Sequence, residues 1–523
     1  MTLKVNMSDL EKRFEHLRGL AGLWLAPLFF LLVWFTNFES LADKPAAHRL
    51  AAVMAAVVTL WVTEAIPMPL TALLGATACV VFQAVPPVLD PSKFAPAKVV
   101  FAPFADQLMF LFIGSFMLAR AIELHGLDRR LALSVLTLRA VGGSPSRVLF
   151  AFGATTAFIS AWISNTATTA MMFAIGLSIL KVLHENSTHT ATGAMTNRLD
   201  PRYATGLMLM TSFSASIGGL ATPIGTPPNA IGLGFIRQHV KLNGVPVEIT
   251  FFEWCLIGVP IVLVLYLFMF VYLNWLCPAG MKELPGGREY LERQRKQLGP
   301  WTRGQISTLI AFVLMVSLWV APGVVALGWG EASDPFKWCK ASLPEAVPAL
   351  LGAGLLFLLP GKKGNRALTW DEATKIDWGV VLLYGGGFAF GVLAQDTGLA
   401  AALGKNMIAF LPDAGSFGFL VAATLVATLV SEATSNTASA NIVVPVVIAM
   451  AQAAGVDPLE PALGATFGCS LGFMLPVSTP CNAIVYGSGM VPLSRMIRYG
   501  ALLDVAGTIV IVAMVRMFSS FVR

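Results

Sequence analysis

The tetrapeptide Ser-Asn-Thr-Ala occurs twice in this chain, at Ser164–Ala167 and at Ser435–Ala438, and each copy interrupts a long apolar stretch. A second breaker of similar composition follows each copy, Gly225-Thr-Pro-Pro-Asn229 after the first and Ser478-Thr-Pro-Cys-Asn482 after the second. In lipid, a backbone that leaves the helix must bury its N–H and C=O groups in protein or use them on a ligand. Matched interruptions in two halves therefore predict a binding site.

These residue types suit both an anion and small hard cations. Serine, threonine and asparagine oxygens cap helix N-termini, and a helix that starts at such a cap directs the positive end of its dipole at whatever lies there. Two such ends facing each other hold an anion. The freed carbonyl groups, together with Ser and Asn side-chain oxygens, form a neutral cage that suits Na⁺. We therefore expect each half to hold one sodium ion beside the anion.

Neither the triplets nor the Thr-Pro elements contain a lysine or an arginine. A dianion among neutral groups at mid-membrane is costly to bury, so cations bound beforehand must supply the attraction. One Ser-Asn-Thr triplet alone is equally consistent with a polar patch that joins two helices. The paired arrangement favours a binding site.

The 523-residue chain is 56% hydrophobic and only 12% charged, with a mean hydropathy of +0.73, which predicts a polytopic, all-α membrane protein. The first apolar run follows a charged leader, and no Ala-x-Ala cleavage site comes after the run, so we interpret it as an uncleaved span. The net charge of +6 arises from basic residues in alternate loops, which indicates topology and implies no nucleic acid partner. The six cysteines include no CxxC pair, and we expect them to be structural.

Taking about 20 apolar residues per span, we predict about 11 transmembrane helices and two re-entrant hairpins. The hairpins are the stretches 146–182 and 416–454, which carry the triplets near their middles, where an unbroken helix is too long for one crossing and interrupted for two. The spans are predicted near residues 20–37, 49–66, 68–85, 104–124, 204–236, 253–277, 304–325, 345–360, 377–397, 461–487 and 500–521.

Basic residues predict the orientation of these spans in a plasma (inner) membrane. With the N-terminus in the cytoplasm, the inner segments hold Arg129, Arg130 and six basic residues between Lys282 and Arg303, while each outer loop carries only one or two. The C-terminal Arg523 is then outside.

The two halves also resemble each other outside the triplets, because the pentapeptide Ala72–Ala76 recurs as Ala349–Ala353. Similar steps in numbering imply a duplicated unit. Each unit has five spans plus a hairpin, and the odd number of spans makes the second copy an inverted repeat, with the first hairpin on the inner and the second on the outer side. The predicted division is a leader with the first span (1–48), repeat 1 (49–277), a cytoplasmic loop (278–303) and repeat 2 (304–523). The apolar stretches 127–141 and 399–411 follow equivalent spans and are either interfacial helices or plain connectors.

Taken together, the motifs resemble those of the divalent-anion/sodium symporter (DASS) family, which carries di- and tricarboxylates or sulfate. The resemblance covers nearly the whole sequence. It rests on the two triplets, on Trp61–Pro67 in the second span, and on Ala221–Asn229 and Leu475–Pro480. It implies an elevator-type transporter in which a substrate-carrying domain slides against a fixed scaffold, a homodimer, and Na⁺ as the coupled ion.

The resemblance also implies the site residues. The first sodium site is expected at Ser160, Ser164, Asn165 and Gly225. The second is expected at Ser431, Thr434, Asn436 and Ser478. The substrate is expected to bind at Asn165, Thr166, Thr226, Pro227, Asn436, Thr437, Thr479 and Pro480. The second Thr-Pro element departs from the family's pattern, because Cys481 follows Pro480 where the first element has a second proline.

The leading functional hypothesis is uptake of a dicarboxylate such as succinate, malate or fumarate driven by Na⁺, with citrate or sulfate as alternative anions. A sodium-independent exchanger and an anion channel are the other hypotheses, and paired hairpins favour an occluded site over an open pore. No His-Glu-x-x-His pair is present and the six histidines lie outside the breaks, so we expect no enzyme. Glu432, three residues before Ser435, could tune the cation site or carry a proton.

Overall fold

The regular structure is almost entirely helical. The computed structural model describes residues 9–521 except 87–94, 142, 189–198, 243, 282, 285, 363 and 409–414. In these residues the strands are β1 (Lys241–Leu242) and β2 (Val245–Pro246), which pair as an antiparallel ribbon.

Breaks between helices coincide with the motifs singled out in the sequence. The helices of the first half are α1 (Asp9–Phe35), α2 (Pro45–Thr63), α3 (Met68–Val81), α4 (Pro96–Phe101), α5 (Gln107–His125), α6 (Leu127–Leu136), α7 (Pro145–Ser160), α8 (Asn165–Thr188), α9 (Pro201–Gly218), α10 (Pro227–His239) and α11 (Phe251–Leu276). The later helices are α12 (Gly287–Gln297), α13 (Arg303–Trp329), α14 (Asp334–Ser342), α15 (Ala346–Leu358), α16 (Trp370–Ala373), α17 (Trp378–Asp396), α18 (Leu399–Ile408), α19 (Gly415–Ala433), α20 (Asn436–Ala453), α21 (Leu459–Gly468), α22 (Pro480–Tyr486) and α23 (Leu493–Phe518). Short 3₁₀ turns are η1 (Glu39–Leu41), η3 (Ala102–Ala105), η4 (Gly219–Ala221) and η5 (Ser519–Phe521).

Within the described residues, 11 helices are long and apolar enough to cross a membrane, or up to 12 if the bent pair α14 and α15 forms one span. The chain is therefore a multi-pass membrane protein, as predicted. The number matches the prediction, but the members differ, because α8, α19 and α20 of the two hairpins also have this length. The span predicted at 68–85 is shorter, since α3 has 14 residues. The segments predicted at 204–236 and 461–487 are each divided by a break.

The two halves exchange packing partners in matching ways. α3 of the first half packs against α17 of the second, and α15 of the second half packs against α5 of the first. Glycine permits both approaches: a Cβ on Gly386 would lie 2.5 Å from Ala72 Cβ, and one on Gly114 would lie 2.6 Å from the Ala349 carbonyl. Ala72 and Ala349 begin the two copies of the repeated pentapeptide, so the sequence repeat corresponds to a repeated helix contact.

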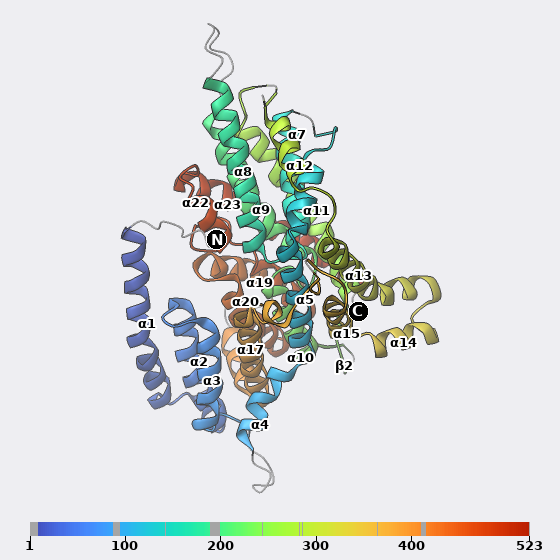
Figure 1. Cartoon of the computed structure of the whole chain (residues 1–523). Helices are drawn as coiled ribbons and strands as arrows, with labels where there is room; N and C mark the ends of the chain where they lie inside the picture. The colour runs from blue at the N-terminus through green and yellow to red at the C-terminus, as the bar shows by residue number, and fades with distance from the viewer. Residues whose placement is uncertain are drawn as a thin grey trace.

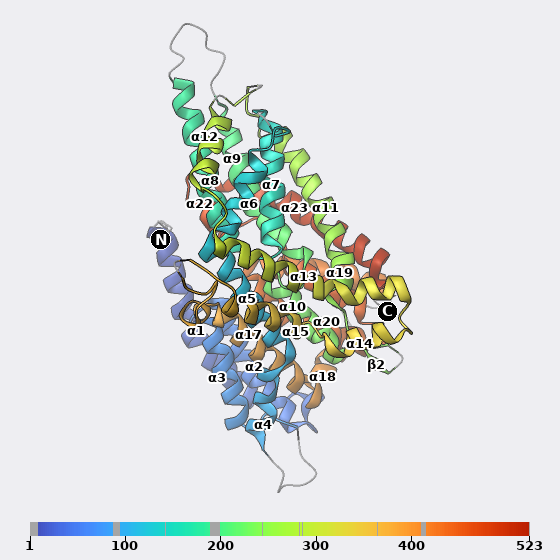
Figure 2. The same cartoon turned by 45° about the vertical axis from the view of Figure 1, so that its right-hand side comes forward.

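Two groups of neighbouring helices mark opposite parts of the molecule. α1, α2 and α3 lie side by side along one edge, while α7, α8 and α9 extend together toward one end (Figure 1). Figure 2 shows α23 beside α11, and α14 projecting on the side of the molecule away from α1.

The charged segment 278–303, predicted to be a solvated loop, contains the helix α12. Arg295 of α12 donates to Thr137 Oγ1 over 3.1 Å, and Arg129 of α6 donates to Gln294 over 2.8 Å. The high charge of α12 is thus compatible with a helix because its polar side chains bond to α6 and to the residue that follows it.

The two apolar stretches that could be helices or connectors contain the helices α6 and α18, and α6 ends five residues before the end of its stretch. α6 packs against α7, and α18 packs against α20, so each lies against a helix of one hairpin. Residues 409–411, Lys282 and Arg523, on which parts of the predicted topology rest, lie outside the described residues.

The matched glycines give a stability prediction. In Gly114→Ala the new methyl group meets the Ala349 backbone, which cannot move aside as a flexible side chain can, so α5 and α15 must separate. We expect a loss of about 1–3 kcal/mol, the usual cost of overpacking a core, seen as a lower midpoint of thermal unfolding in detergent. Gly354→Ala is the control, because nothing lies within 4 Å of its added Cβ. Equal midpoints for the two variants would contradict the packing described.

Candidate functional site

The first hairpin turns at the first triplet, since α7 ends at Ser160 and α8 begins at Asn165. The side-chain amide of Asn165 lies 2.7 Å from Ser160 Oγ. The same amide atom lies 3.1 Å from the carbonyl oxygen of Ala215 and 3.2 Å from that of Gly225. The amide nitrogen of Asn165, in this position, donates to all three oxygens. If a cation binds among these oxygens, the amide must turn so that its oxygen faces the cation. Three neutral oxygens thus face one end of the Asn165 amide.

The second hairpin repeats this arrangement. Ser435 caps α20, and Ser431 Oγ lies 2.9 Å from Asn436 Oδ1 and 2.7 Å from the carbonyl oxygen of Cys469. Asn436 Nδ2 lies 3.5 Å from the carbonyl oxygen of Ser470. In both hairpins a serine at the end of the first helix therefore contacts an asparagine five residues later, and backbone carbonyls of the neighbouring break surround the pair.

Each Thr-Pro break is held by an asparagine that follows it. Asn229 Nδ2 donates to the carbonyl groups ten and seven residues earlier, over 2.8 Å in both cases. Asn482 Nδ2 donates to the carbonyl groups ten and seven residues earlier, over 2.9 and 3.0 Å. Both asparagines are fully buried. Because a buried backbone carbonyl without a partner is costly, these amides stabilise chain that no longer has helical hydrogen bonds.

A glycine in each Thr-Pro break allows the break to lie close to the asparagine of the triplet in the same half. A Cβ on Gly219 would lie 2.6 Å from the end of the Asn165 amide that contacts Ser160, and one on Gly472 would lie 3.3 Å from Asn436 Oδ1. Gly219 and Gly472 also provide the carbonyl groups that lie ten residues before the clamping asparagines. A Cβ on Gly225, a predicted sodium ligand, would lie 2.5 Å from the Gly219 carbonyl oxygen, so only glycine fits there.

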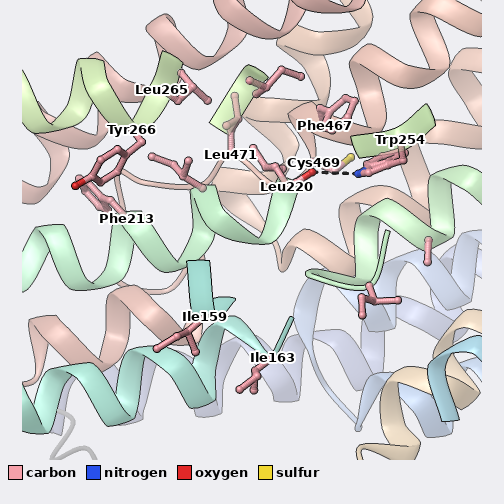
Figure 3. Close-up of a cluster of buried hydrophobic side chains, with 14 of the residues drawn as sticks. Ile159, Ile163, Phe213, Leu220, Trp254, Leu265, Tyr266, Phe467, Cys469 and Leu471 are labelled. Atoms are coloured by element: carbon pink, nitrogen blue, oxygen red, sulfur yellow. Dashed lines mark hydrogen bonds between the residues drawn. The ribbon is translucent and has the colours of Figure 1, made fainter. Parts of the chain in front are cut away.

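The two breaks lie next to each other in the core. Trp254 Nε1 donates to the Leu220 carbonyl over 3.1 Å, and the Trp254 ring stacks on Phe467 with centroids 4.5 Å apart (Figure 3). Phe213 and Phe473 meet edge to face at 5.1 Å. Leu220 belongs to the first break, and Phe467 and Phe473 lie at the second. The structure therefore brings the two Thr-Pro breaks together.

The Thr-Pro helices are α10 and α22, which begin directly after Thr226 and Thr479. Each hairpin packs against the Thr-Pro helix of the other half. α8 of the first hairpin contacts α22, and α20 of the second hairpin contacts α10. A buried hydrogen bond between the two halves runs from Ser212 Oγ to Asn482 Oδ1 over 2.6 Å. Residues predicted on opposite halves of the chain thus face one shared region.

Two predicted sodium ligands direct their hydroxyl groups elsewhere. Thr434 Oγ1 bonds to the Val430 carbonyl over 2.9 Å and to Ser439 Oγ over 2.7 Å. Ser478 Oγ lies 2.7 Å from Glu432 Oε2 and 3.0 Å from the Glu432 carbonyl oxygen. Their backbone carbonyl groups are what these two residues could offer a cation. Glu432 is buried and serves the second break as a hydrogen-bond acceptor.

The predicted substrate residues occupy helix starts. Thr226 and Thr479 are the N-caps of α10 and α22, and a proline follows each at the first helical position. Thr479 Oγ1 accepts from the Asn482 backbone N–H over 3.2 Å, which is the usual capping bond. The exposed members of the predicted site are Ser164, Thr166 and Pro480, and the half-buried ones are Asn165, Pro227, Asn436 and Thr437.

Residues 468–472 read Gly-Cys-Ser-Leu-Gly, which matches the nucleophile pattern of many hydrolases. Ser470 lies in the second break between α21 and α22, without the strand-to-helix turn that this pattern needs. Its hydroxyl is buried and has no hydrogen-bond partner, and so no histidine base bonds to it. Ser470 therefore lacks the local geometry and the bonded base of a nucleophile elbow.

The atoms around both triplets that could bind a cation are amide, hydroxyl and backbone carbonyl oxygens. Hard neutral oxygens of this kind suit Na⁺, and adjacent helix N-termini suit an anion. Asn229 and Asn482, which bond to the break carbonyls, were not among the predicted site residues, although each is the last residue of its Thr-Pro motif. The signal that could have identified them is their position, three residues after the Thr-Pro threonine in both halves.

The hydrogen bonds of Asn482 to the second break give a second stability prediction. Asn482→Ala removes the partner of two break carbonyls and of Ser212, and we expect a loss of about 2–4 kcal/mol, because several buried groups lose their hydrogen bonds together. Ser212→Ala removes only one of these bonds and should cost about 1 kcal/mol. Thermal unfolding of the two purified variants checks the difference. Similar midpoints for both would show that Asn482 does not hold the break.

Comparison with solved structures supports the fold. The chain matches the Alcanivorax borkumensis YdaH transporter with a TM-score of 0.53 at 11% identity, covering 89% of this chain and 98% of that one. It matches Neisseria gonorrhoeae MtrF, described among antimetabolite efflux pumps, with a TM-score of 0.52 at 14% identity, covering 89% and 96%.

Sequence comparison is more specific. A sodium-dependent dicarboxylate transporter SdcS of Staphylococcus saprophyticus is 32% identical over 510 residues, which are 97% of this chain and 92% of that protein. SdcS of Staphylococcus aureus strain USA300 is 32% identical over 502 residues, or 95% and 90% of the two chains. The family model described as the sodium:sulfate symporter transmembrane region matches residues 19–522. The chain therefore belongs to the sodium:sulfate symporter family, the DASS family that its motifs resemble.

Proposed function

We propose that this protein couples the inward movement of Na⁺ to the uptake of a dicarboxylate of the succinate, malate and fumarate class. The observation that carries the proposal is the matched pair of oxygen clusters at Ser160–Asn165 and Ser431–Asn436. The name of the SdcS relatives, sodium-dependent dicarboxylate transporter, supports the same ion and anion class.

Electrostatics explains why the ion and the anion move together. The contacts made by the two triplet asparagines are to neutral groups. A dianion is costly to transfer into such a site at mid-membrane. Two sodium ions held beside it offset that cost, and the N-termini of α8, α10, α20 and α22 add their positive dipole ends. Anion binding therefore depends on prior sodium binding, which couples the two movements.

We further propose the elevator form of alternating access, in a homodimer. The mobile body consists of the two hairpins with the Thr-Pro helices, and the fixed scaffold contains α5, α13, α15 and α17. α6 and α18, each packed against a hairpin helix, are suited to be the connecting arms. In this proposal the two repeats, 49–277 and 304–523, have inverted topology in a plasma membrane, with the N-terminus in the cytoplasm and the C-terminus outside.

Reconstituted proteoliposomes test the function directly. With an inward Na⁺ gradient we expect uptake of radiolabelled succinate, and with K⁺ in place of Na⁺ we expect uptake near the level of empty liposomes. Excess unlabelled malate or fumarate should compete. Equal uptake with and without Na⁺ would support an exchanger instead, and a flux of thousands of ions per second would indicate a channel. Stronger competition by sulfate than by malate would change the anion class.

The sodium ligands give a mutational prediction. Asn165→Ala and Asn436→Ala each remove one amide from a cluster, and we expect the Na⁺ concentration for half-maximal uptake to rise about tenfold, as for the loss of about one hydrogen bond to a charged group. Expression should be retained because neither change opens the apolar core. Asn37→Ala, at an exposed residue beyond α1, is the matched control. Unchanged sodium dependence in both cluster variants would refute the assignment.

A further inference from the structure

One face of α17 lies against helices of the proposed mobile body. Tyr384, Gly387 and Gly391 follow one another at steps of three and four residues, so they share one side of this helix. Figure 1 shows α17 beside α10 and α20, which both contact it, and a Cβ on Gly234 of α10 would overlap the Tyr384 hydroxyl oxygen. Because α17 belongs to the proposed scaffold, this face is a boundary between the two bodies of the proposed elevator.

Glycine keeps the helices close together at this boundary. A Cβ on Gly391 would overlap the ring of Phe235 in α10. One on Gly387 would overlap Asn441 Oδ1 of α20 and would lie 2.5 Å from Asn441 Cγ. The neighbouring Gly386 points elsewhere, because it packs against α3. The Asn441 side chain thus occupies the space that any side chain at position 387 would need.

Asn441 connects this boundary to the proposed substrate site. Its Nδ2 donates over 3.0 Å to the carbonyl of Thr437, a predicted substrate residue in the first turn of α20. The Asn441 side chain is 5% exposed, and its Oδ1 has no hydrogen-bond donor among the described residues. At the exposed end of the same two helices, Gln395 donates to Gln452 over 3.3 Å, where water can replace the bond. The buried amide oxygen therefore holds α20 against α17 by its shape, without a hydrogen bond that separation would have to break.

The first half has different residues at the corresponding places. By position in the repeat, Ser115 corresponds to Gly387, and Ala170 corresponds to Asn441. Neither Ser115 nor Ala170 has an amide, and a serine replaces the glycine. An amide of the hairpin against a glycine of the scaffold is therefore a feature of the second half that the repeat itself does not require.

We propose that Asn441 is a positioning residue of the transport cycle: its side chain, seated over Gly387, sets where the mobile body stops against α17. Its bond to the Thr437 carbonyl connects that stop to the first turn of α20. This role deepens the proposed elevator movement and rests on it. The contact is closed in this structure and opens each time the mobile body slides, so it governs the rate of transport and not the affinity of the sodium sites.

Uptake by single and double variants tests the seat of Asn441. In Gly387→Ala the added methyl group overlaps the Asn441 amide, so the closed arrangement becomes rarer, and we expect kcat for succinate to fall about tenfold, within the usual effect of overpacking. Asn441→Ala should have a smaller effect. The double variant should recover to the level of Asn441→Ala, because the added Cβ lies 3.4 Å from the Cβ at position 441, an ordinary contact. The Na⁺ concentration for half-maximal uptake should stay the same in all three.

Gly386→Ala is the matched control, because its added methyl group meets Ala72 and not Asn441. Asn441→Ala should not relieve the defect of this variant. A double variant at 387 and 441 that stays as slow as Gly387→Ala would contradict the proposal. Equal relief of Gly386→Ala would also contradict it, because Asn441→Ala would then act by loosening the protein in general.

A cross-link tests whether the contact opens during transport. Gly387→Cys and Asn441→Cys are introduced together in protein whose six native cysteines are replaced by alanine. The two Cβ atoms then lie 3.4 Å apart, close to the usual spacing in a disulfide. Mild copper-phenanthroline oxidation should join them and stop succinate uptake, and a reductant should restore it. Oxidation should not change uptake by Asn441→Cys alone or by Gly387→Cys combined with Asn441→Ala.

A merely structural contact would stay closed throughout the cycle. Cross-linked protein that takes up succinate as fast as the reduced protein would therefore overturn this role while the proposed function stands. Absence of the cross-link, in protein that elutes as a single folded species, would overturn the contact itself. Wild-type protein that takes up no dianion would overturn the proposed function and this role together.

Discussion

Backbone groups freed from helices inside a membrane protein need partners, and the rest of this structure depends on how four breaks meet that need. Two buried asparagines, Asn229 and Asn482, each bond to two break carbonyls with the same spacing. Two further asparagines, Asn165 and Asn436, take up positions against glycines of those breaks. The oxygens that remain around them are neutral and convergent, which is the environment that an alkali cation prefers. The proposed ion sites thus arise from the same requirement as the breaks themselves.

Duplication alone does not bring the two sites together; the exchange of partners does. α8 packs on α22 and α20 packs on α10, so each hairpin lies against the Thr-Pro helix of the other half. The aromatic contacts of Trp254 and Phe473 join the two breaks through the core. In the proposed mechanism, a cation in either half would contribute to the field at one shared region, so that two weak attractions would act on the same anion.

Much of this arrangement could be predicted from the sequence, because polar and proline-containing breakers that recur at matched places in apolar stretches mark interrupted helices. The positions of the breaks, the hairpins and the contact of Asn165 with Ser160 follow from the motifs and the family resemblance. The directions of the Thr434 and Ser478 hydroxyls do not, since they depend on Ser439 and Glu432, whose places are set by tertiary packing. The predicted full span at 68–85 was also wrong, because apolar residues continue past the end of α3 and made the helix look longer than it is. Helix α12 was missed because a highly charged segment gives the same pattern as a loop until its partners on α6 are known.

The most direct test of sodium bound before the anion is the affinity of purified protein for succinate at a series of Na⁺ concentrations, measured by calorimetry at constant ionic strength. Two ions that bind in advance, one in each oxygen cluster, predict a slope near two when the logarithm of the association constant is plotted against that of sodium concentration below saturation. A slope near zero, with succinate bound equally well in K⁺, would contradict a site made attractive to a dianion by sodium.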